Sequence, residues 1–189
     1  MLNNKSKRLE IKIGGVGGQG VVYAANFLGL ALSYKKGHVS VSISYGPESR
    51  GSLTTSELVF SEKPIDYPHV EGIDILVAMH QLAYTKLSPN VRETGFILID
   101  SFYPAKGKKP DKSQMAPCRH YFIPASNIAQ KEIGDITMAN IILCGAIIQI
   151  TKLTNHAEAI QALKQISSPQ LYPLSEKALI AGLSYNIVK

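Results

Sequence analysis

The 189-residue sequence has no tryptophan and only two cysteines, Cys118 and Cys144, which lie far apart. Two thiols cannot hold a four-iron cluster, which takes four thiolates. Without a signal for secretion, two separated cysteines are expected to be free thiols. Cys144 lies within an apolar run and is predicted to belong to the core. The chain by itself is therefore not an iron–sulfur protein.

Long hydrophobic runs are also missing. No stretch reaches the roughly 18–20 uninterrupted apolar residues of a membrane helix, and the nearest candidate, residues 136–150, contains Asn140. We expect a buried core helix there, with the Asn140 side chain bonded to a nearby loop backbone, since an unpaired buried amide is costly. The N-terminus, residues 1–8, is polar and has no apolar signal core. These features predict a cytoplasmic protein with no membrane segment and a flexible N-terminus.

The excess of positive over negative charge is also small. The net charge is only +6, and part of it is concentrated in the run at residues 106–112. This run has Gly and Pro but no interleaved aromatic residue, so it is predicted to be a solvated loop, with a phosphate-rich ligand or an acidic partner as the alternative. No nucleic-acid recognition motif is present, and the five histidines show no metal-ligand spacing.

The order of apolar patterns predicts the fold class. Short β-branched or alternating segments predict strands, at residues 9–13, 38–45, 53–60, 73–79, 96–100 and 121–123. Helical spacing and capping residues predict helices, at residues 20–36, from 81, 126–133, 135–153, 155–166 and 173–188. Three of these helices are predicted to be capped by Ser126, by Asp135 and by Asn155 together with Glu158. The expected fold is a single α/β domain over residues 1–189, Rossmann-like, with a mostly parallel twisted sheet flanked by helices on both faces.

A glycine-rich loop, Gly14 to Gly20, follows the first strand and opens the first helix. Gly15, Gly17 and Gly20 satisfy the GxGxxG pattern in the right context. Glycines let the backbone approach a ligand closely, and the free N–H groups at a helix start attract phosphate or carboxylate. The alternative is a tight strand–helix turn that binds nothing.

Two familiar nucleotide sites do not fit this loop. A dinucleotide-binding fold needs an acidic residue at the end of the second strand to hold the ribose, but residues 39–45 contain none. The loop also lacks the GK[ST] of a nucleoside-triphosphatase. An NAD-dependent dehydrogenase is therefore disfavoured.

A second motif, residues 44–52, follows the second strand and reads Ser-Tyr-Gly-Pro-Glu-Ser-Arg-Gly-Ser. A donor-rich loop at the carboxyl end of a strand is a common place for function in α/β proteins. The Arg50 guanidinium could make a bidentate contact with a carboxylate or phosphate. Equally, Glu48 and Arg50 could lock the loop internally.

The two motifs together resemble the gamma subunit of the 2-oxoacid:ferredoxin oxidoreductases, which act on pyruvate, 2-oxoglutarate, branched-chain 2-oxoacids or indolepyruvate. The resemblance covers residues 9–163 and continues through residues 61–65, 74–79, 123–125 and 138–141. It departs from the family at Ser52 and Cys144, where glycines are common. Among these enzymes the four-subunit, 2-oxoglutarate type is the most similar.

The resemblance implies a role within a larger complex. Such complexes use thiamine diphosphate, iron–sulfur clusters and coenzyme A to convert a 2-oxoacid to acyl-CoA, CO₂ and reduced ferredoxin. This chain lacks cluster cysteines and the thiamine signature, a Gly-Asp-Gly followed further on by paired asparagines. The thiamine diphosphate and the clusters are therefore expected in alpha, beta and ferredoxin-like delta partners, and the isolated chain is expected to be inactive and able to self-associate.

We expect this gamma subunit to complete the assembly and, as a hypothesis, to offer a site for the phosphates of coenzyme A. No catalytic or metal residue is predicted. The candidate cofactor-binding residues are Gly15, Gly17, Gly18, Gln19, Gly20, Ser44, Tyr45 and Arg50. The alternative function is a stand-alone module that binds coenzyme A or a nucleotide without catalytic partners.

Overall fold

A computed structural model describes residues 8–45, 52–101 and 115–186. All six predicted strands are present and form one sheet in the order β2-β3-β1-β4-β5-β6. The strands are β1 (Arg8–Val16), β2 (His38–Tyr45), β3 (Leu53–Ser61), β4 (Ile73–Ala78), β5 (Val91–Asp100) and β6 (Arg119–Ile123). Alternating segments and short apolar runs together were thus sufficient to find every strand.

The helices follow the predicted order. They are α1 (Val21–Ser33), α2 (Gln81–Leu87), α3 (Ala125–Ile128), α4 (Ala139–Thr151), α5 (His156–Ile166) and α6 (Tyr172–Ser184). The described residues also form three short turns: the 3₁₀ turns η1 (Ser88–Asn90) and η5 (Ile136–Met138), and the π-helical turn η4 (Ala129–Ile133).

The sheet is mixed but mostly parallel, as predicted. Strands β1, β4, β5 and β6 run in one direction. Strand β3 runs against both of its neighbours, β1 and β2. A short connection between β2 and β3 allows only an antiparallel pair, because a parallel pair needs a long crossover.

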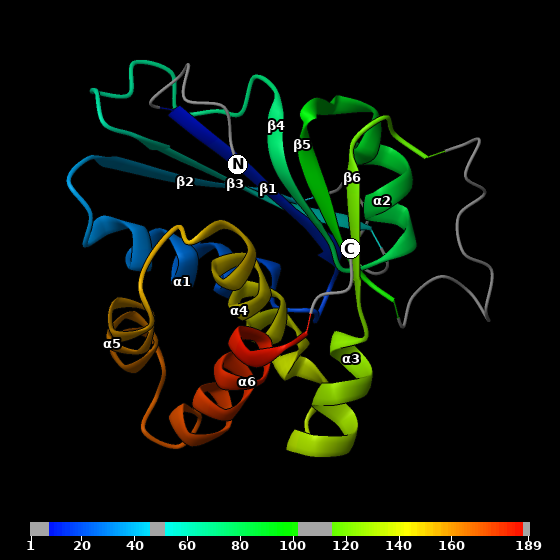
Figure 1. Ribbon diagram of the computed structural model, residues 1–189, viewed down its shortest axis with the longest axis vertical. Helices are drawn as coiled ribbons and strands as arrows, with labels where there is room; N and C mark the ends of the chain where they lie inside the picture. Colours follow the sequence, from blue (N-terminus) through cyan, green and yellow to red (C-terminus); the bar gives the residue numbers. More distant parts are fainter. Residues whose placement is uncertain (1–7, 46–51, 102–114, 187–189) are drawn as a thin grey trace.

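The pleat divides the core between the two faces of the sheet. On β5, Phe96 and Leu98 belong to the larger core, whereas Ile97 and Ile99 belong to the smaller one. Figure 1 shows α1, α4, α5 and α6 gathered on one side of the sheet and α2 on the other. Both faces of the sheet therefore carry helices, as predicted, but among the described residues one face carries four of them and the other only α2.

Helix α4 is the centre of the larger core. Ten of its 13 residues are buried, which confirms the prediction of a core helix. It packs closely on α6, where a Cβ added at Gly145 would lie 2.6 Å from the carbonyl oxygen of Leu179. A Cβ at Gly182 would collide with the carbonyl oxygen of Ile142. Two glycines thus set the spacing between the helices.

The predicted helix caps are confirmed in two of three cases. Asn155 and Glu158 form a capping box at the start of α5. The Asp135 side chain accepts a hydrogen bond from the backbone N–H of Thr137 at the start of η5. The prediction for Ser126 was wrong, because α3 begins at Ala125 with Pro124 at the N-cap. The Ser126 hydroxyl instead donates to the buried Asp100 carboxylate at 2.5 Å.

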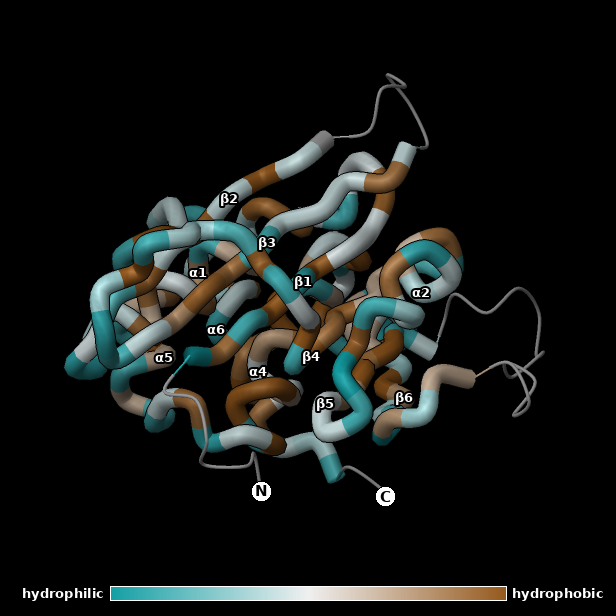
Figure 2. Tube along the Cα trace, turned by 90° about the horizontal axis from the view of Figure 1, so that it is seen from above, coloured by the Kyte–Doolittle hydropathy of each residue, from teal (hydrophilic) through white to brown (hydrophobic). Residues whose placement is uncertain are grey.

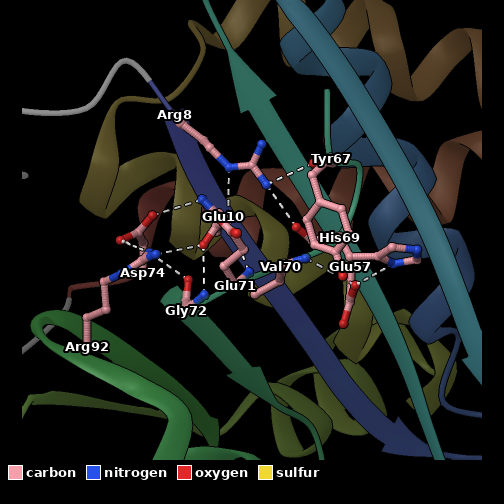
Figure 3. Close-up of polar contacts among 10 residues, drawn as sticks. All are labelled: Arg8, Glu10, Glu57, Tyr67, His69, Val70, Glu71, Gly72, Asp74 and Arg92. Carbon is pink, nitrogen blue, oxygen red and sulfur yellow. Dashed lines mark hydrogen bonds and ion pairs between the residues drawn. The ribbon is translucent and has the colours of Figure 1, made fainter. Parts of the chain in front are cut away.

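A polar cluster lies at the amino end of β1 (Figure 3). The Glu10 side chain is only 1% exposed and accepts bonds from Arg8 Nε at 2.7 Å and from Arg92 Nη2 at 2.9 Å. It also accepts from the backbone N–H of Gly72 at 2.9 Å, and Arg92 Nη1 bonds Asp74 at 2.8 Å. The cluster holds the β3–β4 connection against the sheet.

We expect Gly182→Ala to lower the free energy of unfolding. Alanine favours a helix over glycine by about 1 kcal/mol, but the new methyl group would overpack α4 at a cost of about 1–3 kcal/mol. Ser184→Ala, at an exposed position of the same helix, is the matched control and should change stability by less than about 0.5 kcal/mol. Urea denaturation of both variants measures the difference, and a Gly182→Ala protein as stable as the wild type would contradict the close approach.

The buried Glu10 carboxylate should make the stability of the protein depend on pH. Burial raises the pKa of Glu10, but bonds from Gly72, Arg8, Glu71 and Arg92 outweigh it and hold the pKa below its usual 4.5. A carboxyl whose pKa is lower when folded stabilises the fold above its unfolded pKa, and this stability is lost as the pH falls through the folded pKa. Unfolding free energies measured from pH 7 to pH 3 should therefore fall more steeply for the wild type than for Glu10→Gln. Glu93→Gln, at an exposed site on β5, should keep the wild-type slope.

Candidate functional site: the glycine loop

The glycine loop lies at the carboxyl edge of the sheet. Strand β1 ends at Val16 and α1 begins at Val21, so four residues carry the chain from strand to helix. Two of them, Gly18 and Gly20, have positive φ angles of 89° and 71°. A residue with a side chain would be strained at either position, so these two glycines make the turn possible.

The backbone of this loop offers free donors. Among the residues that the structure describes, the N–H groups of Gly17 and Gly18 donate no hydrogen bond. Gly20 is the N-cap of α1 and provides no side-chain cap. An added Cβ at Gly17 or Gly18 would meet no atom within 4 Å. Unpaired donors beside open space at a helix N-terminus are the physical requirement for an anion site.

Gln19 holds the loop in shape. Its Oε1 accepts the N–H of Val16 at 2.8 Å, and its Nε2 donates to the carbonyl of Met79 at 2.9 Å. The N–H of Met79 in turn donates to the carbonyl of Gly14 at 2.9 Å. The Gln19 amide therefore ties the end of β1 to the residue that follows β4.

Asn140, in the first turn of α4, holds the end of the loop by a hydrogen bond. Its Nδ2 donates to the carbonyl of Gly20 at 3.2 Å, and its Oδ1 accepts the N–H of Ile141 at 2.7 Å. This confirms the prediction that a polar residue on the apolar helix bonds a loop backbone. Any Cβ at Gly20 would collide with the Asn140 amide, so the loop and α4 fit together only with glycine at this position.

A cavity of about 260 Å³ lies against the loop. Its walls come from the loop, from the residue that follows β4, from α3, from η5 and from the start of α4. It is lined by Val16, Gly17, Gly18, Gln19, Met79, Ser126, Ile136, Thr137 and Ala139. The lining residues outside the loop, from Met79 and Ser126 to Ala139, were not predicted from the sequence. Of these, Ala139 lies within residues 138–141, a stretch that carries the family resemblance.

The first two residues of the second motif, Ser44 and Tyr45, lie at the same edge of the sheet. Gly14 pairs with Thr55, and Thr55 pairs with Ser44; Gly15 pairs with Thr54, and Thr54 pairs with Tyr45. Two strand spacings, about 10 Å, therefore separate the motifs. Val39 and Val41 of β2 face Gly29 of α1, so Ser44, which alternates with them, lies on the face of β2 away from α1. Arg50 falls outside the described residues.

The described residues that line the cavity offer backbone groups and neutral side chains. None of them has an ionisable side chain. In the part of the chain that the structure describes, no group of His, Cys, Asp or Glu could hold a metal ion. His80, at the end of β4, accepts a bond from the N–H of Leu82 and caps α2. No described helix is long and apolar enough to cross a membrane.

Burial disfavours the thiolate form of both cysteines. Burial raises the pKa of Cys144, which is fully enclosed beside α1. Burial also raises the pKa of Cys118, and the charge of Arg119 offsets this only in part. Both are free thiols, as predicted.

Sequence comparison places the chain among subunits of 2-oxoacid oxidoreductases. The family model for pyruvate ferredoxin/flavodoxin oxidoreductase matches residues 10–185. The 2-oxoglutarate synthase subunit KorC of Methanocaldococcus jannaschii is 36% identical over 184 residues, which cover 96% of this chain and 95% of that protein. KorC of Methanothermobacter thermautotrophicus is 34% identical and covers 93% of each chain.

Solved structures agree with this placement. The gamma subunit of a keto/oxoacid ferredoxin oxidoreductase from Geobacter sulfurreducens has a TM-score of 0.77 at 29% identity, over 93% of this chain and 94% of that chain. A 2-oxoglutarate:ferredoxin oxidoreductase from Magnetococcus marinus, solved with 2-oxoglutarate, coenzyme A and succinyl-CoA, has a TM-score of 0.81. At 19% identity it shows the fold alone, and this chain matches 31% of its length. The chain belongs to the pyruvate ferredoxin/flavodoxin oxidoreductase family, as a gamma-type subunit of a 2-oxoacid:ferredoxin oxidoreductase.

Proposed function

We propose that this subunit serves an enzyme that acts on 2-oxoglutarate and that its glycine loop receives a phosphate group of coenzyme A. The first part is supported by the two KorC relatives, which match nearly the whole chain. The second part rests on one observation, the unpaired N–H groups of Gly17 and Gly18 at the N-terminus of α1.

The proposed division of labour follows from what the chain lacks. Its two cysteines cannot hold an iron–sulfur cluster, and it has no thiamine signature. Decarboxylation and electron transfer to ferredoxin would then belong to alpha, beta and delta partners. The gamma subunit would complete the assembly and present one wall of the coenzyme A site, at the carboxyl edge of its sheet.

The loop suits a phosphate for three reasons. Its free donors are backbone groups, whose positions are fixed by the Gln19 bridge and by Asn140. The positive end of the α1 dipole adds attraction for a negative charge. None of the described residues that line the cavity is a carboxylate, and the neighbouring carboxylates of Asp100 and Asp135 accept hydrogen bonds from Ser126 and Thr137. The role of these groups is to bind and orient, and they move no proton.

Arg50 is the proposed second contact. The sequence places it six residues beyond Ser44, and Ser44 lies at the same sheet edge as Gly14. A guanidinium there would complement the neutral backbone donors with a full positive charge. Ser44 and Tyr45 belong to the same proposed contact region.

A charge placed at Gly17 tests the phosphate site directly. The φ angle of Gly17 is not in the left-handed region, and a side chain there would meet open space. Gly17→Asp should fold normally but repel phosphate, whereas Gly17→Asn has nearly the same shape and no charge. In the reconstituted complex we expect the KM for coenzyme A to be at least about tenfold higher for Gly17→Asp than for Gly17→Asn, which corresponds to about 1.4 kcal/mol. Equal KM values for the two variants would refute a phosphate at this loop.

The subunit assignment has its own test. A tagged chain purified anaerobically from its native host should bring down a thiamine-binding chain and a cysteine-rich, ferredoxin-like chain, and the assembly should oxidise 2-oxoglutarate with coenzyme A. Mass spectrometry identifies the chains, and assays with pyruvate and ketoisovalerate identify the substrate. Recovery of the chain alone, even after gentle cross-linking, would instead favour a stand-alone module that binds coenzyme A or a nucleotide.

A further inference from the structure

Strand β2 forms one edge of the sheet and runs along the outer margin of the molecule (Figure 2). All eight of its residues pair with β3 in an unbroken register, from His38 with Ser61 to Tyr45 with Thr54. Among the described residues no strand pairs with its other side. Half of the backbone N–H and C=O groups of a regular edge strand face outward and can accept another strand.

This edge lacks the features that usually prevent pairing. Edge strands are commonly protected by charged residues, proline, a bulge or short length. The sequence of β2, His-Val-Ser-Val-Ser-Ile-Ser-Tyr, has no Lys, Arg, Asp, Glu or Pro, and its register with β3 has no bulge. The opposite edge differs, because β6 has only five residues and begins with Arg119. The contrast indicates that β2 is left open for a partner strand.

The two faces of β2 have different characters. Val39 and Val41 face α1, because a Cβ added at Gly29 of that helix would contact both side chains. Ile43 continues this apolar row but is 42% exposed, since it extends past the cover of the helix. Ser40, Ser42 and Ser44 form the row on the other face. An occupant of the edge should therefore present apolar groups on one face and small polar groups on the other.

We propose that the occupant is β2 of a second copy of this chain, paired antiparallel about Val41. In that register Val41 lies opposite its own copy, and Ile43 lies opposite Val39 of the second copy. Ser40 lies opposite Ser42 of the second copy. Val39, Val41 and Ile43 thus each meet an apolar residue, and Ser40 and Ser42 meet each other.

Symmetry and the different characters of the two faces restrict the register. A two-fold axis perpendicular to the sheet keeps the helical layers of both copies on one side and makes the contact isologous, so that it closes as a dimer. A slip by one residue would place Val41 opposite a serine and bring apolar and polar faces together. Centring the pair on Ser42 would also match the faces, with Val41 opposite Ile43, and opposed charges at positions 40 and 42 distinguish the two centres. The pairing would join two six-stranded sheets into one and cover Ile43. This inference rests on the sheet and its edge, independently of the proposed ligand and substrate.

Opposed charges test the register in the full chain. In Ser40→Lys/Ser42→Lys each dimer would place lysine directly opposite lysine twice, whereas Ser40→Lys/Ser42→Glu would place lysine opposite glutamate twice. We expect a concentration-dependent dimer of the wild type by sedimentation velocity. The dissociation constant should rise at least about tenfold in the first variant relative to the second, because like charges directly opposite each other destabilise a strand pair.

Three results would overturn the proposal. They are a monomeric wild type at all concentrations tested, equal dimerisation of the two variants, and stronger dimerisation of the first variant. Circular dichroism checks that both variants fold. If either does not, Val41→Cys in a Cys118→Ser background should cross-link to itself on oxidation, and Ser44→Cys in the same background should not. A failure of Val41→Cys to cross-link would then count against the proposed register.

Discussion

The close fit between the glycine loop and helix α4 is the constraint on which the rest of the site depends. Gly20 approaches Asn140 so closely that no side chain fits between them, and the Asn140 amide bonds the Gly20 carbonyl. Helix α4 is itself enclosed by its neighbours and held against α6 by Gly145 and Gly182. Because α4 cannot move without disturbing the core, the loop above it is fixed as well. A fixed loop can keep its free N–H groups aimed at one place without losing entropy on binding.

The two ends of the sheet differ in how their polar groups are paired. At the amino end, Glu10 and Arg92 satisfy their charges within the chain and hold the β3–β4 connection (Figure 3). Glu57 contributes in the same way, through Lys12 and the backbone of Val70. At the carboxyl end the donors of Gly17 and Gly18 have no partner within the described chain. Paired charges stabilise the fold at one end, and unpaired donors at the other can bind a ligand.

Much of the fold could be predicted because it depends on local pattern. Alternating segments and short apolar runs indicated all six strands, and the capping box at Asn155 and Glu158 marked the start of α5. Contacts between distant residues could not be predicted in this way. Ser126 looked like a helix cap, but its partner is Asp100, 26 residues earlier. Gln19 was predicted to contact a ligand, and no local pattern showed that its amide also bonds the carbonyl of Met79, 60 residues later. A polar side chain in a loop has several potential partners, and only the assembled sheet decides among them.

The central claim is that a gamma-type subunit contributes a backbone anion site to the complex. A structure of the assembled enzyme with coenzyme A bound tests it most directly. We expect a phosphate group of coenzyme A within hydrogen-bonding distance, about 3 Å, of the N–H groups of Gly17 and Gly18. Coenzyme A bound elsewhere, with a side chain of a partner subunit filling the cavity beside the loop, would contradict it.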